Sequence, residues 1–225
     1  MRSQRGRSHL RIPQRSGAAT AAQTRMYASR SALLAQQLRT EIGSVPSSPH
    51  GGPALVVMMG LPGVGKSYCA RLLCERLGAA LVASDELRSR LFVAASYADE
   101  ENRAIFAAIE ALVDQLLAEG HRVVVDATNL LARNRAGTVA AAKRRGAPIL
   151  FVRVSAPESE TRERLLSRSA SRAAGDHSEA DERVYERMRA QPFEPPTEGF
   201  LELVNGTGLA GGVDTVVAAV DAATR

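Results

Sequence analysis

The order of apolar and polar residues along the chain predicts alternating strands and helices between residues 54 and 222. Short apolar runs, typical of buried strands, alternate with longer segments whose apolar residues recur every three or four positions. The predicted strands are 54–59, 80–83, 122–125, 149–154 and 200–204. The predicted helices are 66–77, 100–119, a polar arginine-rich helix between the third and fourth strands, a segment within 158–189 interrupted near 173–176, and 213–222. This alternation is typical of a parallel α/β sheet.

Residues 1–52 have a different pattern and are predicted to precede the domain, which spans 53–225. The first 25 residues are rich in Arg, Ser, Ala and Gln and lack apolar periodicity, which predicts disorder. A short helix is expected at about 28–42, followed by a linker rich in Pro and Gly. Three explanations of the first 25 residues stay open: translation beginning at Met26, a basic arm, or a transit peptide.

The excess positive charge of the chain lies in this extension. Residues 1–40 hold eight arginines and no acidic residue, whereas the rest of the chain holds 21 basic and 24 acidic residues, a net charge of −3. A basic domain face for duplex nucleic acid is therefore not supported. No apolar stretch approaches the roughly 20 residues of a membrane-spanning helix. We expect no membrane association, and the sequence indicates no obligate protein partner.

The cysteine positions bear on the compartment. Cys69 and Cys74 lie five positions apart on one predicted helix, beyond disulfide reach, and show no metal-ligand spacing with the histidines. They are expected to be core residues in a reducing compartment. A cytoplasmic location is predicted, with an organellar one as the alternative if residues 1–25 are a transit peptide.

The strongest motif for function is Gly60-Leu61-Pro62-Gly63-Val64-Gly65-Lys66-Ser67. It lies between a predicted strand and a predicted helix, the setting of a phosphate-binding loop. The backbone N–H groups of this turn and the positive end of the helix favour a nucleotide phosphate. Lys66 would reach the β- and γ-phosphates, and the Ser67 hydroxyl would ligate Mg²⁺.

Two more predicted strands are followed by aspartates at the edge where parallel α/β sheets bind ligands. Asp85 is the candidate base for an acceptor hydroxyl, because Arg88 lies three residues on and would face the same way to grip an anionic group. Asp126 is the candidate for the metal side. The alternatives are helix-cap or turn aspartates and a solvated surface arginine.

Arginines in the segment 158–189 are candidates for a lid over the transferred phosphate. Arg164 and Arg168 are the strongest of a run that also includes Arg162 and Arg172. Glutamates are interleaved with them, so a salt-bridged surface helix is the alternative. Arg133 and Arg135, which follow the Asp126 loop, are weaker candidates for contact with the acceptor.

In combination, these motifs resemble the P-loop kinase family called AAA domain 33, which includes polynucleotide 5′-kinase-like and zeta-toxin-like proteins. The resemblance covers about residues 53–215. It rests on the loop at 60–67, Ser-Asp-Glu-Leu-Arg at 84–88, Asp-Ala-Thr-Asn-Leu at 126–130 and Arg-Leu-Leu-Ser-Arg at 164–168. It implies a three-layer α/β/α P-loop NTPase fold with a five-stranded parallel sheet in the order 2-3-1-4-5, a helical lid within 158–189, and ATP with Mg²⁺.

The resemblance also implies roles for the candidate residues. They are a base at Asp85, an acceptor contact at Arg88, and a lid arginine at Arg164 or Arg168. Asn129 and Arg133 are further candidates for contact with the acceptor. The expected reaction is transfer of the γ-phosphate of ATP to a hydroxyl of a small molecule or of a nucleic-acid 5′ end. A zeta-toxin-like nucleotide-sugar kinase and an ATPase switch or binding protein without an acceptor are the alternatives.

Overall fold

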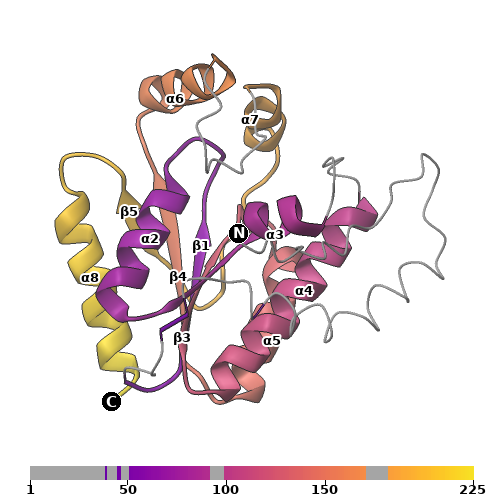
Figure 1. Ribbon diagram of the computed structural model, residues 1–225. Helices are drawn as coiled ribbons and strands as arrows, with labels where there is room; N and C mark the ends of the chain where they lie inside the picture. The colour runs from indigo at the N-terminus through magenta and orange to yellow at the C-terminus, as the bar shows by residue number, and fades with distance from the viewer. Residues whose placement is uncertain (1–38, 40–44, 47–50, 92–98, 171–181) are drawn as a thin grey trace, which may run out of the picture.

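The computed structural model describes residues 39, 45–46, 51–91, 99–170 and 182–225 (Figure 1). The strands are β1 (Ala54–Met59), β2 (Ala80–Ala83), β3 (Arg122–Asp126), β4 (Ile149–Ser155) and β5 (Leu201–Val204). The helices are α2 (Lys66–Leu77), α3 (Ser84–Leu91), α4 (Asp99–Ala118), α5 (Ala132–Arg144), α6 (Glu158–Ala170), α7 (Glu182–Arg189) and α8 (Leu209–Ala223). Most of the helix and linker predicted before the domain lies outside the described residues.

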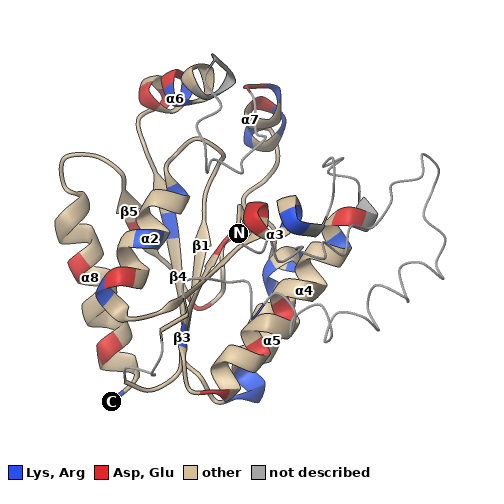
Figure 2. Ribbon diagram, in the orientation of Figure 1, with Lys and Arg blue, Asp and Glu red and all other residues tan. Residues whose placement is uncertain are grey.

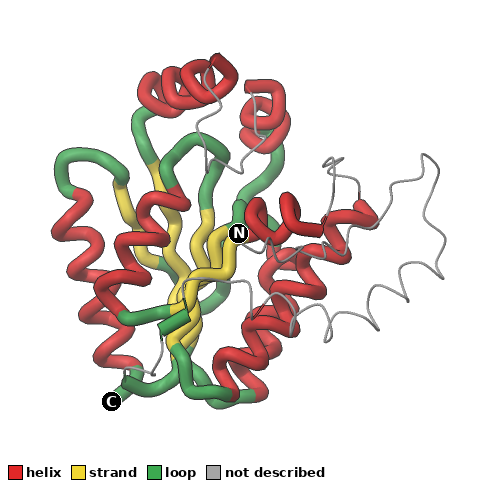
Figure 3. The backbone as a smooth tube through the Cα atoms, in the orientation of Figure 1, coloured by secondary structure: helices red, strands yellow, loops and turns green. Residues whose placement is uncertain are grey.

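The five strands, yellow in Figure 3, form one parallel sheet. Their order is β2-β3-β1-β4-β5, which confirms the predicted order. β1 lies at its centre and pairs with β3 on one side and β4 on the other. All strands therefore end at the same edge of the sheet. Helices α6 and α7 lie beyond that edge, above the loop that joins β1 to α2 (Figure 1).

Helices cover both faces of the sheet and form two cores. Successive side chains of a strand point to opposite faces. Val56 of β1 therefore packs with Cys69 of α2 and Val216 of α8, whereas Val57 packs with Ile109 of α4. Because β1 is buried on both faces, its six residues form the continuous apolar run that predicted this strand.

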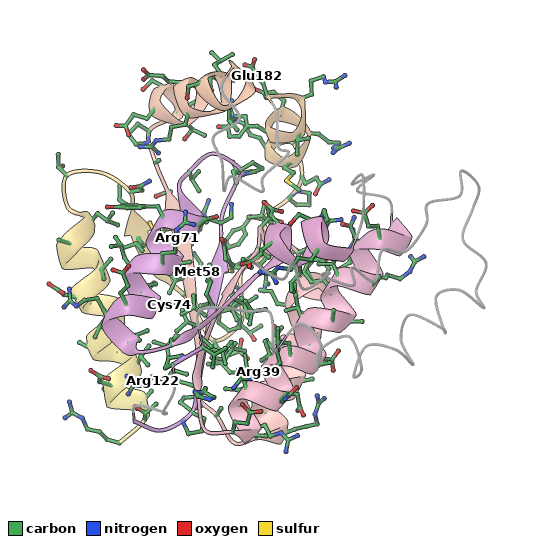
Figure 4. All side chains as sticks on the ribbon, in the orientation of Figure 1. Arg39, Met58, Arg71, Cys74, Arg122 and Glu182 are labelled. Carbon is green, nitrogen blue, oxygen red and sulfur yellow. The ribbon has the colours of Figure 1, made fainter. Side chains whose placement is uncertain are left out.

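At the edge opposite the loops, Arg122 ties β3 to the end of α8 (Figure 4). Its Nη1 lies 2.8 Å from Asp221 Oδ1, and its Nη2 donates to the Thr224 hydroxyl at 3.0 Å. None of the described helices has enough consecutive apolar residues to cross a lipid bilayer.

The element boundaries differ from the sequence predictions in a few places. The largest difference is α8, which begins at Leu209 rather than at Val213. The added turn holds Gly211 and Gly212, and glycine has a low helix propensity. A Cβ at Gly212 would lie 2.6 Å from Leu203 Cδ1, so close packing of α8 on β5 leaves no room for a side chain there. β3 includes Asp126, and β5 begins at Leu201. The break predicted near 173–176 lies outside the described residues.

Candidate functional site

The loop between β1 and α2 is shaped by glycines in left-handed conformations. The φ angles of Gly63 and Gly65 are +81° and +89°, values that L side chains rarely adopt. Gly65 is also the N-cap of α2, which has no side-chain cap and no acidic residue in its first turn. Within the described residues, the amides of Gly63, Val64 and Gly65 donate to no backbone carbonyl. Open amides at an uncapped helix N-terminus are the elements of an anion site.

Two of the loop glycines are also required by the elements packed against them. A Cβ at Gly60 would lie 2.5 Å from the carbonyl oxygen of Val154 in β4. One at Gly63 would lie 2.9 Å from Leu165 Cγ in α6. Helix α6 therefore touches the loop directly, which places the predicted lid next to the predicted phosphate site.

Lys66 and Ser67 occupy the start of α2. The Lys66 side chain is buried, and its Nζ donates to the Leu61 carbonyl oxygen at 2.8 Å, so the ammonium group folds back over the loop. The Ser67 hydroxyl makes no side-chain hydrogen bond within the described part of the chain. Both groups lie at the helix end where the motif predicted phosphate and metal binding.

Asp126 ends β3 directly beside the end of β2, since its sheet partner is Ala83. Its side chain is buried, and among the described residues it makes no hydrogen bond or ion pair. Strand alternation turns it toward α2. Burial first, and the negative charge of Asp126 second, raise the pKa of the Cys69 thiol on α2 to about 11. Asp126 therefore lies within electrostatic range of the helix that begins with the phosphate-binding residues.

The donor set at this place fits Mg²⁺. The described residues hold no group of three or more His, Cys, Asp or Glu side chains that would form a metal site by themselves. A magnesium ion does not need one, because it is usually held by one or two protein oxygens together with phosphate oxygens and water. The unengaged hydroxyl of Ser67 and carboxylate of Asp126 are suitable oxygen ligands.

Asp85 is the second residue of α3, and β2 runs into that helix without a loop. Its side chain is half-buried at the carboxyl edge of the sheet. Arg88, one turn further on, is buried instead of facing an open site. It forms an ion pair with Glu101 of α4 and donates to Asn102 Oδ1 at 2.8 Å. The expectation that Arg88 contacts the acceptor does not match this arrangement, in which it connects α3 to α4.

Asn129 also has a partner inside the protein. It is only 1% exposed, its φ is +48°, and its Nδ2 donates to the Met58 carbonyl oxygen at 2.9 Å. Figure 4 labels Met58 at the centre of the sheet. The Gly60 amide donates to Thr128 at 3.0 Å in the same region. Asn129 therefore joins the β3 loop to β1, and its side chain is not presented to an acceptor.

The two arginines at the start of α5 differ sharply. Arg133 is exposed. Arg135 is buried and donates at 2.6 Å both to the Asn129 carbonyl and to the Glu194 carbonyl. Its burial lowers its pKa. Arg135 thus ties the segment after α7 to the β3 loop, and Arg133 is the one that remains a candidate for the acceptor.

The arginines of α6 divide in the same way. Arg162 is held between the two lid helices by Glu158, Glu182 and Glu186 and lies over the Tyr185 ring at 5.6 Å. Figure 2 shows both signs of charge mixed on α6 and α7. At Arg162 the structure therefore matches the alternative expectation, a salt-bridged helix surface formed by arginines and the glutamates interleaved with them.

Arg164 has a different environment on the side toward the loop. Its Nη2 donates to Glu160 Oε2 at 2.6 Å, while its Nη1 is buried and has no hydrogen-bond acceptor in the described structure. Its positive charge lowers the pKa of Cys69 on α2, against the larger effect of burial. Arg168 also belongs to α6, but its side chain lies outside the described part.

One residue of the site was missed by the sequence reasoning. Asn205, directly after β5, donates from Nδ2 to the Val64 carbonyl oxygen at 2.9 Å. A Cβ at Gly65 would lie 2.0 Å from that same Nδ2. The available signal was its place at a strand end, the criterion that singled out Asp85 and Asp126.

Several solved structures have a similar fold. Kti12 from Chaetomium thermophilum, in complex with ADP-AlF3, is 22% identical and matches 76% of this chain and 99% of its own at a TM-score of 0.62. A putative kinase from Chloroflexus aurantiacus is 20% identical over 77% and 100%, with a TM-score of 0.60. The APS kinase CysC of Mycobacterium tuberculosis, in complex with AMPPNP and APS, is 21% identical over 75% and 98%, with a TM-score of 0.54.

The match to protein families is more specific. No curated protein matches the chain. The profile of a family described as AAA domain matches residues 55–196, from β1 to the segment before β5. With the P-loop geometry and the kinase sheet order, this match shows that the chain belongs to the AAA domain 33 family and has its P-loop kinase-like fold.

Proposed function

We propose that this protein transfers the γ-phosphate of ATP to a hydroxyl group of a small molecule or of a nucleic-acid 5′ end. The observation that carries the proposal is the pairing of β2 with β3, which sets Ala83 opposite Asp126. Asp85 follows Ala83 by two residues, so two carboxylates lie at the sheet edge next to the phosphate-binding loop. Phosphoryl transfer uses one carboxylate for the metal and one for the acceptor hydroxyl.

On the donor side, the loop amides and Lys66 would bind the phosphates. The Lys66 ammonium now donates to the Leu61 carbonyl, and a γ-phosphate oxygen would take the place of that carbonyl. Ser67 and Asp126 would hold Mg²⁺, which supplies charge neutralisation on the phosphates when it is bound.

On the acceptor side, Asp85 would receive the proton of the attacking hydroxyl as the new oxygen–phosphorus bond forms and ADP leaves. Arg133 is retained as an acceptor contact because it is exposed at the first turn of α5. Arg88 and Asn129 are reassigned to holding α3 and the β3 loop in place.

The lid contribution is assigned to Arg164. A transferred phosphoryl group develops charge on its equatorial oxygens, and an arginine placed over it stabilises that charge. The buried, unpaired Nη1 of Arg164 supports this role, since a guanidinium nitrogen without an acceptor is costly until an anion supplies one.

The test is transfer of label from γ-labelled ATP to a panel of 5′-hydroxyl oligonucleotides, nucleosides, sugars and nucleotide sugars. Asp85→Asn should lower the rate of label transfer to the acceptor by about 10²-fold or more while ATP still binds. The matched control is Glu86→Gln, the next residue of α3, whose carboxylate pairs with Arg90 at 2.5 Å. Unchanged turnover in Asp85→Asn would contradict the assignment of the base.

A second function is favoured by the positions of Arg88 and Asn129. Two of the three expected acceptor contacts are directed into the protein, which suits a nucleotide-dependent switch or binding protein that has no acceptor. The same assay separates the two: hydrolysis of ATP with no acceptor labelled, and with full activity in Asp85→Asn, would favour the switch.

A further inference from the structure

Asn205 contacts the phosphate-binding loop from the end of β5, an outermost strand of the sheet. It lies 141 residues after Val64, yet its Nδ2 donates to the Val64 carbonyl oxygen at 2.9 Å. Its own backbone is fixed, because its amide donates to the Ser155 carbonyl at 2.8 Å and continues the ladder in which Ser155 pairs with Val204. The side chain thus reaches the loop from a position set by the register of β4 and β5.

This contact fixes the orientation of one peptide group. In a planar trans peptide, the carbonyl of Val64 and the N–H of Gly65 point in opposite directions. Holding the carbonyl toward Asn205 therefore turns the Gly65 N–H away from Asn205, and that amide donates to no backbone carbonyl in the described structure. It is one of the open amides at the N-terminus of α2.

Without the contact, this peptide would have more than one accessible orientation. Gly65 has a φ of +89°, and glycine occupies positive and negative φ with similar ease. The glycine on the other side of Val64, Gly63, has a φ of +81°. A peptide next to such residues is easily rotated, and a rotated peptide would present a carbonyl oxygen where the phosphate needs a donor.

We infer that Asn205 is a positioning residue, which holds the Val64–Gly65 peptide in the orientation that binds phosphate. The inference rests on the proposed function in one respect, that the loop binds nucleotide phosphates. It assigns Asn205 to binding of the polyphosphate and not of the nucleoside, with Asn205 acting through the Val64–Gly65 peptide. Loss of the amide donor should then lower the affinity for every ligand that carries the phosphates.

Two variants and a neighbouring control test this. Asn205→Ala removes the donor, and Asn205→Asp keeps the shape but places a carboxylate oxygen against the Val64 carbonyl. Thr207→Ala changes the same exposed loop two residues on without touching the P-loop. The measurements are calorimetric affinities for Mg²⁺-ATP and for Mg²⁺-tripolyphosphate, which lacks the nucleoside, together with thermal unfolding without ligand.

Asn205→Ala should lower the affinities for ATP and for tripolyphosphate by the same factor, about tenfold, which is the usual effect of one hydrogen bond. Asn205→Asp should weaken both further, and Thr207→Ala neither. In turnover, the KM for ATP should rise while the KM for the acceptor stays constant.

The inference is overturned if tripolyphosphate binds Asn205→Ala as tightly as it binds the wild-type protein, whether or not ATP is weakened. Weaker ATP alone would place Asn205 against the nucleoside. If the wild-type protein binds neither ligand, the failure lies in the proposed function, and the inference fails with it. Asp has nearly the same shape as Asn. If Asn205→Ala does not fold, the affinities of Asn205→Asp for the two ligands therefore test the inference.

Discussion

Arg164 donates a hydrogen bond to Glu160, one turn earlier in α6, with 2.6 Å between Nη2 and Oε2. The next residue, Leu165, packs against Gly63 of the phosphate-binding loop. The Arg164–Glu160 pair therefore lies next to the contact between α6 and the phosphate-binding loop. Because it is a partly exposed i,i+4 pair, its contribution to stability is small, about 0.3–0.5 kcal/mol, and its position matters more for the site.

Replacing Arg164 by Ala should lower kcat by about 10²-fold or more, since the guanidinium would stabilise charge on the transferred phosphate. The free energy of unfolding should change by less than about 1 kcal/mol. Steady-state turnover and urea denaturation measure the two effects. Arg187→Ala, an exposed arginine of α7, is the control and should change neither. Equal kcat values for the two variants would exclude Arg164 from the reaction.

Replacing Asp126 by Asn should raise the Mg²⁺ concentration for half-maximal turnover by roughly tenfold or more, because the metal loses an anionic ligand. ATP binding in the presence of EDTA should persist. Turnover against Mg²⁺ concentration and ATP titration with EDTA provide the measurements. Asp214→Asn, whose carboxylate is exposed on α8 and pairs with Arg76, should behave as wild type. An unchanged Mg²⁺ requirement in Asp126→Asn would assign the metal to other ligands.

The fold was predictable because its signals are local. The continuous apolar run of β1 reflects burial on both faces of the strand. The three-to-four spacing of apolar residues in α4 reflects burial of one face of the helix. Strand ends then located Asp85 and Asp126 without any knowledge of packing. The roles of these residues in catalysis stay predictions.

The partners of the arginines were not predictable from local sequence. Helical spacing places Arg88 on the face of Asp85, but it does not reveal that Glu101 of α4 packs across from it. Likewise, spacing does not separate Arg133 from the buried Arg135, whose acceptors include a carbonyl 59 residues away. The partners of these arginines are determined by tertiary packing between distant segments. The contact of Asn205 with the loop is determined in the same way.

Replacing Gly63 by Ala should weaken nucleotide binding and destabilise the protein by about 1–2 kcal/mol, because a side chain at positive φ is strained and its Cβ would lie 2.9 Å from Leu165 Cγ. Calorimetry with ATP and urea unfolding measure both effects. Gly211→Ala in α8 is the matched change, with nothing within 4 Å of its Cβ, and should stabilise the helix by about 0.5–1 kcal/mol. Tight ATP binding by Gly63→Ala would show that the loop and α6 can separate without cost.

Replacing Arg135 by Met should lower the free energy of unfolding by about 2–4 kcal/mol, because the Asn129 and Glu194 carbonyls lose their donors. Arg133→Met, two residues earlier and exposed, should change it by no more than about 0.5 kcal/mol but should raise the KM for the acceptor. Urea unfolding and acceptor titration separate the two effects. Similar stabilities for the two variants would contradict the structural role of Arg135.

The pH dependence of stability should report the environment of Cys69. Burial first and Asp126 second raise its pKa from 9.0 to about 11. A pKa raised by folding means that the folded state holds the proton more tightly, so this stabilisation is complete below about pH 9 and is lost as the pH rises toward 11. Unfolding in urea between pH 8 and 11 should therefore show a steeper loss in the wild-type protein than in Cys69→Ala. Asp126→Asn should give an intermediate slope, because it removes the electrostatic part and leaves the burial. If wild-type and Asp126→Asn proteins lose stability in parallel, Asp126 does not face α2, and its assignment to the metal beside Ser67 loses its geometric support.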